Sequence, residues 1–308
     1  MSDAVIECVP NFSEGMDAAK VESIVAAMHV EGVSLLDWSR DEDHNRSVVT
    51  IAGPPNAVVE AAIRGAGRAA ELINLTRQQG VHPRIGAADV IPFVPISGIS
   101  LEQCAMLARQ AGIEIWKRYS VPVYFYEAAA ARPDRALLED VRRGQFEGLR
   151  EAVKREAARR PDVGGPELHP TAGACAVGAR RFLIAYNVYL DTPDVAAARA
   201  ISRDIRASGG GLSGVKAMGV VAQGHAQISM NITDFRSTPV TKAHAALKAQ
   251  AAKYRVQIVR GELIGLIPED AYEQDAEWVR QLDGFNPEEK ILERKLKNPL
   301  AWPGTDLT

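Results

Sequence analysis

A histidine, an arginine and an aspartate lie close together in the stretch from Gly80 to Ile96, just before a run of apolar residues. Pro83 fixes its own φ angle and disfavours a helical conformation at His82. The histidine therefore lies on an extended connection, from which its side chain can reach a cleft. Its neighbours Arg84 and Asp89 are polar. Because the unperturbed pKa of histidine is near neutral, this stretch can carry acid–base chemistry.

Two interpretations of His82 remain open from the residues alone. It is either a general acid or base, or a loop histidine whose ring satisfies a backbone carbonyl. The apolar run from Val90 to Ile96 predicts a buried strand, provided that Pro92 and Pro95 fall at its edges or at positions without a ladder donor. This strand would hold the polar residues in place, so we take the stretch as the first candidate for a catalytic site.

The composition is that of an ordinary soluble globular chain with room for two cores. Of its 308 residues, 46% are hydrophobic and 24% are charged, and the net charge is −3. Such a balance argues against a general surface for nucleic acid or membranes. We therefore expect small-molecule partners, no nucleic acid and no membrane.

The N-terminus and the cysteines indicate the compartment. The first ten residues contain neither a basic region nor a long apolar segment, so we expect a cytoplasmic protein. Cys8, Cys104 and Cys175 are isolated thiols without CxxC pairing. This pattern fits a reducing compartment and predicts small residues in or near the core rather than a metal cage.

The run from Asp41 to Arg46 contains acidic residues and a histidine, but consecutive loop residues cannot all point at one ion. We therefore expect no metal. We interpret the run as a polar loop in which Asn45 and Arg46 face a cleft. Arg46 then either holds a carboxylate through its planar guanidinium or simply pairs with Asp41 or Asp43.

The apolar periodicities predict the same order of elements twice. Residues Val5 to Val94 indicate strand, helix, strand, strand, helix and strand, and Phe182 to Val259 repeat that order. Between them, Pro161 to Gly178 is rich in glycine and proline without a periodic pattern, so we expect a loop or linker. The sequence thus predicts an α+β fold of two ferredoxin-like βαββαβ subdomains, 1–178 and 179–308, with a ligand cleft between them.

Local signals predict several helix starts. Asp17 can cap one helix, and Ser100 followed by Gln103 is a capping-box pattern. Thr192-Pro193 and Thr238-Pro239 each offer a capping threonine followed by a proline at the first helical position. These starts agree with the helices that the two halves require.

Six longer motifs occur in order between Glu7 and Pro268. They are Glu-Cys-Val-Pro-Asn-Phe-Ser-Glu-Gly at 7–15, His-Asn-Arg-Ser-Val at 44–48, His-Pro-Arg-Ile-Gly-Ala-Ala-Asp-Val at 82–90, Pro-Asp-Val-Gly at 161–164, Gly-Ala-Arg-Arg-Phe-Leu-Ile-Ala-Tyr-Asn at 178–187 and Gly-Leu-Ile-Pro at 265–268. Through these motifs the sequence resembles the formiminotransferase family, which includes the N-terminal part of the bifunctional formimidoyltransferase-cyclodeaminases.

The resemblance implies transfer of the formimidoyl group from N-formimidoyl-L-glutamate to N5 of tetrahydrofolate, a step of histidine degradation, with tetrahydrofolate as co-substrate. It also implies that His82 is the catalytic histidine, acting as base and then as acid. We further expect a homodimer. The folate-binding segment that the resemblance implies consists of Val163, Gly164, Gly165, Pro166, Glu167, Leu168, His169, Pro170, Thr171 and Ala172.

The roles of the neighbouring residues are hypotheses from residue type and proximity. Asp89 can orient His82, while Arg46 and Arg84, with Asn45 beside them, can hold the carboxylates of glutamate. Two alternatives remain open, which are transfer of a formyl group and a folate-binding protein in which His82 is idle. Because the bifunctional members continue beyond the point where this chain ends, we expect another protein to perform the cyclodeaminase step.

Overall fold

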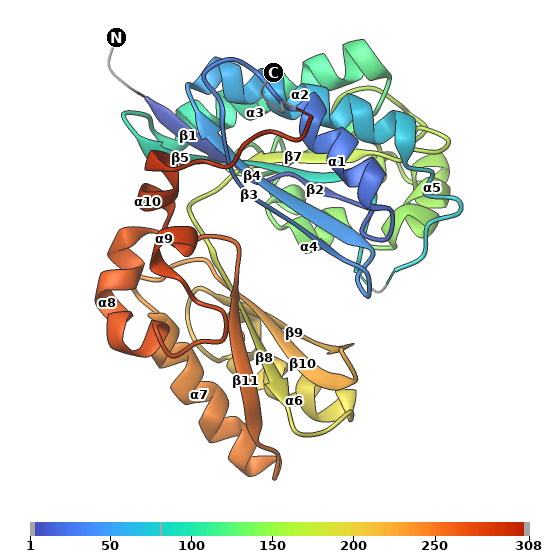
Figure 1. Cartoon of the computed structure of the whole chain (residues 1–308). Coiled ribbons are helices and arrows are strands. Elements are labelled where there is room, and N and C mark those ends of the chain that lie inside the picture. Colours follow the sequence, from blue (N-terminus) through green and yellow to red (C-terminus); the bar gives the residue numbers. More distant parts are fainter. Residues whose placement is uncertain (1–3, 81, 305–308) are drawn as a thin grey trace. The chain divides into compact units, whose positions relative to one another are not determined.

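The computed structural model describes residues 4–80 and 82–304. They form two compact units, which we describe separately. Among the described residues, unit 1 comprises those up to Arg180 together with 299–304, and unit 2 runs from Arg181 to Asn298. Each unit has its own sheet, its own helices and its own hydrophobic core (Figure 1). The α+β class predicted from the sequence is confirmed at this level.

Unit 1 is built on one mixed sheet. Its described strands are β1 (Val5–Cys8), β2 (Asn11–Phe12), β3 (Ser34–Asp41), β4 (Arg46–Gly53), β5 (Ala88–Ser97), β6 (Val123–Glu127) and β7 (Cys175–Ala179). β1 and β2 both lie antiparallel between β4 and β5, and β3 pairs with the other side of β4. Beyond β5 the sheet continues with β7 and then β6, all three parallel.

Strand β7 corrects the expectation that Pro161 to Gly178 forms a loop throughout. It lies between two other strands, and all of its residues are buried. A strand covered on both faces shows no alternation of apolar and polar residues. This one also consists mainly of cysteine, alanine and glycine, which lack the branched and aromatic side chains that mark strands. The sequence pattern could not reveal it for these two reasons.

The helices of unit 1 cover both faces of this sheet. They are α1 (Ala18–Ala27), α2 (Pro55–Leu72), α3 (Leu101–Tyr119), α4 (Leu138–Val141) and α5 (Gln145–Arg155), with short 3₁₀ turns η1 (Pro133–Arg135) and η2 (Ala157–Arg159). Helix α2 packs against both α1 and α3. Figure 1 shows these three helices on one side of the strands and α4 on the other.

Two predicted helix starts in unit 1 are confirmed. The Asp17 carboxylate accepts the N–H of Lys20 at 3.2 Å at the start of α1. At the start of α3, Ser100 accepts the Gln103 N–H at 3.2 Å, while the Gln103 side chain accepts the Ser100 N–H at 2.8 Å. These bonds satisfy backbone donors that the first helical turn leaves without partners.

The core of unit 1 includes all three thiols and receives the last described residues of the chain. Cys8, Cys104 and Cys175 are free and buried, as predicted. After unit 2, the Leu300 N–H donates to the Leu35 carbonyl at 2.8 Å. Leu300 therefore extends the edge of the sheet beside β3 and packs on the core.

Unit 2 is built on an antiparallel sheet. Its described elements are β8 (Ile184–Leu190), α6 (Val195–Ile205), η3 (Ala207–Gly209), β9 (Val215–Ala222), β10 (His225–Ile232), α7 (Val240–Lys253), β11 (Ile258–Ile264), α8 (Glu269–Val279), α9 (Pro287–Lys290) and α10 (Leu292–Lys297). The strands lie in the order β11-β8-β10-β9. Helices α6 and α7 pack against each other, and α6 packs against β9 and β10.

The two threonine-proline starts predicted in unit 2 are wrong in detail. Helix α6 is capped by Asp194, whose carboxylate accepts the Ala196 N–H at 2.8 Å, while Thr192 accepts the N–H of Asp194. Thr238 donates its hydroxyl to the Ser213 carbonyl at 2.8 Å and does not cap α7. Each threonine hydroxyl instead forms a hydrogen bond with a backbone group of a nearby loop, and such local bonds compete with helix capping.

No helix among the described residues is long and apolar enough to cross a membrane.

Candidate active site

His82 lies in a bend between α2 and β5 of unit 1 and lines a narrow pocket. The free space in the pocket is about 10 Å³, which is room for about one water molecule. The structure brings together in this pocket His82 and the four neighbouring residues with roles predicted from the sequence, Asn45, Arg46, Arg84 and Asp89. The described residues that line it are Phe12, Ser13, His44, Asn45, Arg46, Gln78, His82, Arg84 and Asp89.

The turn between β3 and β4 supplies one wall of the pocket. Asn45 occupies the left-handed region at φ 45°, which asparagine tolerates better than most residues. Its side-chain oxygen accepts the Gly15 N–H at 2.9 Å, and its amide donates to the Gln79 carbonyl at 2.7 Å. Asn45 therefore fixes the turn to the segment that precedes His82, and its contacts here are with the protein backbone.

Arg84 is held by two partners within unit 1. Its guanidinium donates to both carboxylate oxygens of Glu147, at 3.1 and 2.9 Å. It also donates to the side chain of Gln78, and to the Gln78 carbonyl at 3.0 Å. Such a paired fork is a strong, geometrically specific contact. In this conformation four of the five N–H donors of Arg84 have partners, and these bonds order the segment around His82.

Asp89 is buried at the start of β5 and binds two groups. One carboxylate oxygen accepts the Ile85 N–H at 2.7 Å, and the other forms an ion pair with Arg142, which follows α4. The sequence suggested that Asp89 orients His82. The structure instead engages both of its oxygens with other partners, so its observed contribution is to hold Arg142 near the pocket.

Arg46 brings a second guanidinium to the pocket. Its Nε atom is buried and has no hydrogen-bond partner among the described residues. Burial, followed by the positive charge of Arg142, lowers the pKa of Arg46 to about 10, so the group remains cationic at neutral pH. An unpaired guanidinium donor in a polar pocket is suited to bind an anionic group such as a carboxylate.

The surroundings of His82 keep its ring neutral. Burial is the main cause that lowers its pKa far below the usual value, and the positive charges of Arg46 and Arg142 lower it further. A neutral imidazole has a free lone pair and can accept a proton. Its protonated form is destabilised by the two guanidinium groups, so it would readily give the proton up.

His44 is a residue of this pocket that sequence reasoning missed. The ring Nδ1 of His44 lies 2.8 Å from the Asp41 carboxylate. The same carboxylate accepts the backbone N–H of His44 at 2.9 Å. The hydrogen bond from His44 is the largest cause that lowers the pKa of Asp41. The rings of His44 and His82 meet edge to face, with centroids 6.4 Å apart. The only local signal was an aspartate three residues before a histidine in a tight turn.

The segment from Val163 to Ala172 lies in the same unit and docks beside the His82 stretch. The Thr171 carbonyl accepts the Leu75 N–H, and the Ala172 carbonyl accepts the Ala87 N–H, both at 2.9 Å. These two contacts lie on either side of His82 in the sequence. Backbone hydrogen bonds therefore hold the segment against the chain on either side of the His82 stretch.

This segment contains an exposed block of residues followed by residues that are mostly buried or partly buried. Leu168 and Ala172 are buried, whereas Gly164 to Glu167 are exposed. The Nδ1 atom of His169 accepts the N–H of Ala172 at 2.9 Å, so this ring stabilises its own turn. The exposed block contains the cis peptide bond between Gly165 and Pro166. It is the longest exposed run of the segment and so offers a ligand the most accessible surface.

The described side chains do not form the groupings that bind metal ions. Among the residues that the structure describes, no group of three or more histidine, cysteine, aspartate or glutamate side chains could hold an ion. The chemistry of the pocket is that of imidazole, guanidinium and carboxylate groups.

Comparison with known proteins identifies the family. A family model described as the N-terminal subdomain of the formiminotransferase domain matches residues 5–180, and a model described as the formiminotransferase domain matches residues 185–293. The chain belongs to the formiminotransferase family. The resemblance found in the sequence motifs is thereby confirmed.

Three curated members of the family illustrate the similarity. A glutamate formimidoyltransferase of Thermoplasma acidophilum is 44% identical over 96% of this chain and 98% of its own length. One of Streptococcus pyogenes serotype M1 is 42% identical over 95% of this chain and 98% of its own length. The formimidoyltransferase-cyclodeaminase of Gallus gallus is 35% identical over 94% of this chain and 59% of its own length.

Proposed function

We propose that this protein is a glutamate formimidoyltransferase, which transfers the formimidoyl group of N-formimidoyl-L-glutamate to N5 of tetrahydrofolate in histidine degradation. Two relatives of that name, similar over nearly their whole length, support the proposal. The structural observation that carries it is the placement of His82 and Arg46 in one pocket, where burial and the positive charges of Arg46 and Arg142 lower the pKa of His82. A proton acceptor next to cations fits an uncharged nucleophile and a donor that bears carboxylates.

The proton balance of the reaction assigns two successive tasks to His82. N5 of tetrahydrofolate attacks the amidine carbon, and the N5–C bond of a tetrahedral intermediate forms. His82 accepts the proton that N5 loses. The resulting imidazolium then protonates the glutamate nitrogen, and the bond between that nitrogen and the amidine carbon breaks. The products are glutamate and 5-formimidoyltetrahydrofolate, and His82 is neutral again.

The two guanidinium groups favour the second of these tasks. Because Arg46 and Arg142 destabilise a positive charge on His82, the imidazolium is a strong acid that transfers its proton readily to the leaving nitrogen. A carboxylate of the donor bound at Arg46 would reduce this repulsion and so make the first proton transfer easier. The substrate itself would then adjust the basicity of the catalytic histidine.

We assign positioning roles to His44 and Asp41. The Asp41 carboxylate accepts the Nδ1–H of His44, which leaves Nε2 of that ring as a hydrogen-bond acceptor. The pocket that His44 and His82 share has room for about one water. A water molecule there would connect the two rings. This space is too small for an amidine group, so we infer that the pocket opens when the donor binds.

We infer different roles for the two arginines predicted to hold glutamate. Arg46 binds a carboxylate of the donor, because its Nε is unpaired among the described residues. Arg84 keeps the segment around His82 in place through Glu147 and Gln78. The exposed block Gly164 to Glu167 contacts tetrahydrofolate, because it is the accessible part of a segment docked beside the His82 stretch.

We also infer that each unit is an elaborated βαββαβ subdomain of the ferredoxin-like type. In unit 2 the spatial order β11-β8-β10-β9 corresponds to the fourth, first, third and second strands of that motif. In unit 1 the strands lie in the order β5-β1-β4-β3, which likewise corresponds to the fourth, first, third and second strands of the motif. Strands β7 and β6 extend this arrangement on one side.

An assay of the purified protein tests the function. Incubation with N-formimidoyl-L-glutamate and tetrahydrofolate should yield 5-formimidoyltetrahydrofolate and glutamate, with undiminished turnover in the presence of a chelator. Values of kcat/KM for N-formimidoyl- and N-formyl-L-glutamate should favour the formimidoyl donor. A preference for the formyl donor would replace the proposed reaction, and folate binding without turnover would leave only a binding function.

A further inference from the structure

A large cavity lies in unit 2, on residues that the proposed reaction does not use. Its volume is about 1040 Å³, and it is partly open to solvent. Helix α7, strand β11 and the segment from Trp278 to Asp283 form its walls. Pockets that bind small organic molecules usually have volumes of about 300–1,000 Å³, so this cavity is large enough for such a ligand.

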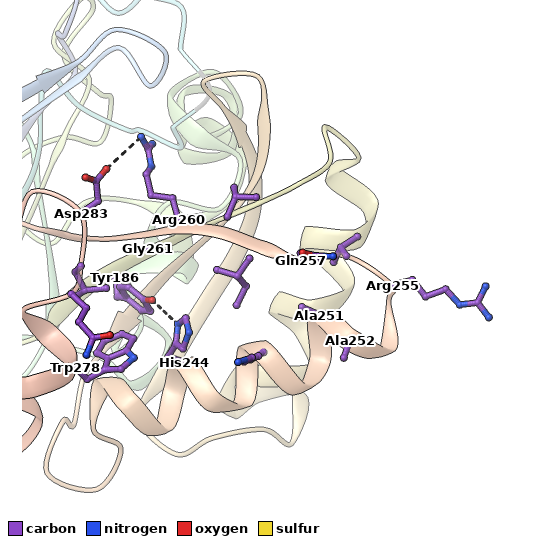
Figure 2. Close-up of a pocket in the computed structure, with 16 residues that line it drawn as sticks. Tyr186, His244, Ala251, Ala252, Arg255, Gln257, Arg260, Gly261, Trp278 and Asp283 are labelled. Atoms are coloured by element: carbon purple, nitrogen blue, oxygen red, sulfur yellow. Dashed lines mark hydrogen bonds and ion pairs between the residues drawn. The ribbon is translucent and has the colours of Figure 1, made fainter.

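Three aromatic rings from three different elements gather at one end of this cavity (Figure 2). The ring centroids of His244 and Trp278 lie 4.9 Å apart, and those of Tyr186 and Trp278 lie 5.8 Å apart in an edge-to-face contact. Tyr186 is fully buried, whereas Trp278 is half-buried. The indole therefore offers an accessible aromatic surface on which a planar ring can pack.

A hydrogen bond fixes the chemistry of His244 at this end. The Tyr186 hydroxyl lies 2.8 Å from Nδ1 of His244. Burial raises the pKa of Tyr186, and burial together with the charge of Lys248 lowers the pKa of His244. With His244 neutral, we assign the phenol as the donor to Nδ1, because a phenol O–H is a stronger donor than an imidazole N–H; the remaining ring nitrogen, Nε2, then carries a hydrogen. His244 can donate this N–H to an acceptor on a ligand.

Glycine at position 261 permits this arrangement. A Cβ atom at Gly261 would lie 2.5 Å from the Tyr186 hydroxyl oxygen, so any larger residue would push the hydroxyl away from His244. The β11 wall thus lacks a side chain where the tyrosine and histidine meet. Ala251 and Ala252 of α7 have only methyl groups where the helix lines the cavity.

The outer part of the cavity is cationic. Lys248 lies one turn after His244 on α7, on the same side of the helix, and Arg255 follows the helix end; both are exposed. Figure 2 shows Arg255 far from the aromatic end. Arg260 is 3.9 Å from Asp283, so these two charges offset each other. Lys248 is the lining cation whose charge is felt at His244.

We propose that this cavity is a binding site for planar aromatic anions. The ring system of the ligand packs on Trp278, a hydrogen-bond acceptor of the ligand receives the His244 N–H, and a carboxylate, sulfonate or phosphate group pairs with Lys248. The chain as a whole is negatively charged, with a net charge of −3. Attraction of an anion therefore depends on this local arrangement. The residues that line it differ from those that line the pocket of His82.

Two fluorescent probes test the proposal on the full chain. One is 8-anilinonaphthalene-1-sulfonate, an aromatic anion, and the other is N-phenyl-1-naphthylamine, which has the same rings without the charge. The sulfonate should bind once per chain. Lys248→Gln should weaken its binding about tenfold, the effect of losing one favourable charge contact of about 1.4 kcal/mol, while the neutral amine should change by less than about twofold.

Matched variants make the result specific. Lys253→Gln removes the same charge from an exposed position of the same helix outside the cavity lining, and it should leave the binding of both probes unchanged. Trp278→Leu should weaken both probes and reduce energy transfer from tryptophan to the sulfonate. Formimidoyl transfer should persist in all three variants. Equal effects of the two lysine variants, or sulfonate binding that none of the three variants weakens, would overturn the site.

Discussion

The imidazole rings of His44 and His82 meet edge to face in unit 1, with centroids 6.4 Å apart. His44 is bound in turn to the Asp41 carboxylate through a contact of 2.8 Å. Both histidines line the same narrow pocket. The general base proposed for the reaction therefore has a second histidine beside it, and that histidine is oriented by a carboxylate.

Loss of the Asp41 carboxylate, which orients His44, should lower turnover without altering substrate binding. Asp41→Asn should reduce kcat about tenfold, which corresponds to about 1.5 kcal/mol for a hydrogen bond to a charged group. KM should change little, because Asp41 does not line the pocket. Asp41→Glu should recover part of the loss. Asp43→Asn, which removes the same charge from the same loop, is the control and should have normal kinetics.

Replacement of His82 tests the proton transfer itself. His82→Ala should reduce kcat by roughly 10²- to 10⁴-fold, the usual contribution of a positioned acid or base, with little change in tetrahydrofolate affinity. Steady-state kinetics and folate titration of the purified variant measure the two effects. A variant with a raised KM and normal kcat would show that His82 binds substrate and does not move a proton.

The charge of Arg46 should be visible in the pH profile. A histidine with an ordinary pKa would cause kcat/KM to fall below about pH 6.5, where the base becomes protonated. Burial and the two guanidinium groups lower the pKa of His82, so wild-type kcat/KM should not show this fall near neutral pH. Arg46→Met removes a cause of the lowering, and any acid limb due to His82 should shift to higher pH.

The control for this experiment is Arg40→Met. Arg40 belongs to β3, pairs with Glu42 and does not line the His82 pocket. Its removal changes the net charge equally, so the pH profile should match that of the wild type. A profile of Arg46→Met that also matches the wild type would mean that the Arg46 charge does not act on His82. A raised KM for the donor would separately support carboxylate binding by Arg46.

Arg84 should behave as a structural residue. Arg84→Met removes the paired contact with Glu147 and the bonds to Gln78, which should lower the free energy of unfolding by about 1–3 kcal/mol. Urea denaturation measures this loss. Arg150→Met, which alters an exposed arginine of the same helix as Glu147, should have a smaller effect. Unchanged stability with a strongly raised KM would restore the sequence hypothesis that Arg84 binds the donor.

Local features of the sequence predicted local structure well. The capping box of Ser100 and Gln103 is formed entirely by neighbouring residues, and both of its hydrogen bonds are present. Helix α1 buries Val21, Ile24 and Val25, whose spacing of three and four residues places them on one face of a helix. In these cases the pattern and the contact that it predicts lie within one or two turns of the same helix, so the rest of the fold has little influence.

Contacts between distant segments could not be predicted in the same way. Arg142 reaches Asp89 only because the chain after α4 returns to the start of β5. His44 lies near His82 because bonds from Asn45 to Gln79 and from Gln78 to Asn45 tie the turn between β3 and β4 to the segment before His82. Residue types identified His82 and Arg46 as candidates. Which carboxylate and which cation lie beside each of them depends on tertiary packing.

Gly164 offers a test of the proposed folate contact. Its φ angle is +78°, and a Cβ atom there would lie 2.5 Å from the Trp116 ring. Gly164→Ala must therefore shift the exposed block of the segment, and KM for tetrahydrofolate should rise while kcat at saturation persists. Gly224→Ala is the control, because Gly224 has a φ of +75° but open space around it.

A second substitution separates the clash from other effects of Gly164→Ala. Trp116→Leu removes the ring that the new methyl group would meet, so the double variant should recover part of the tetrahydrofolate affinity, even though the strain of the left-handed backbone remains. Such recovery would tie folate binding to the position of this block. If Gly164→Ala binds tetrahydrofolate as tightly as the wild type and Gly224→Ala do, the exposed block is not a folate contact and the ligand must bind elsewhere on the chain.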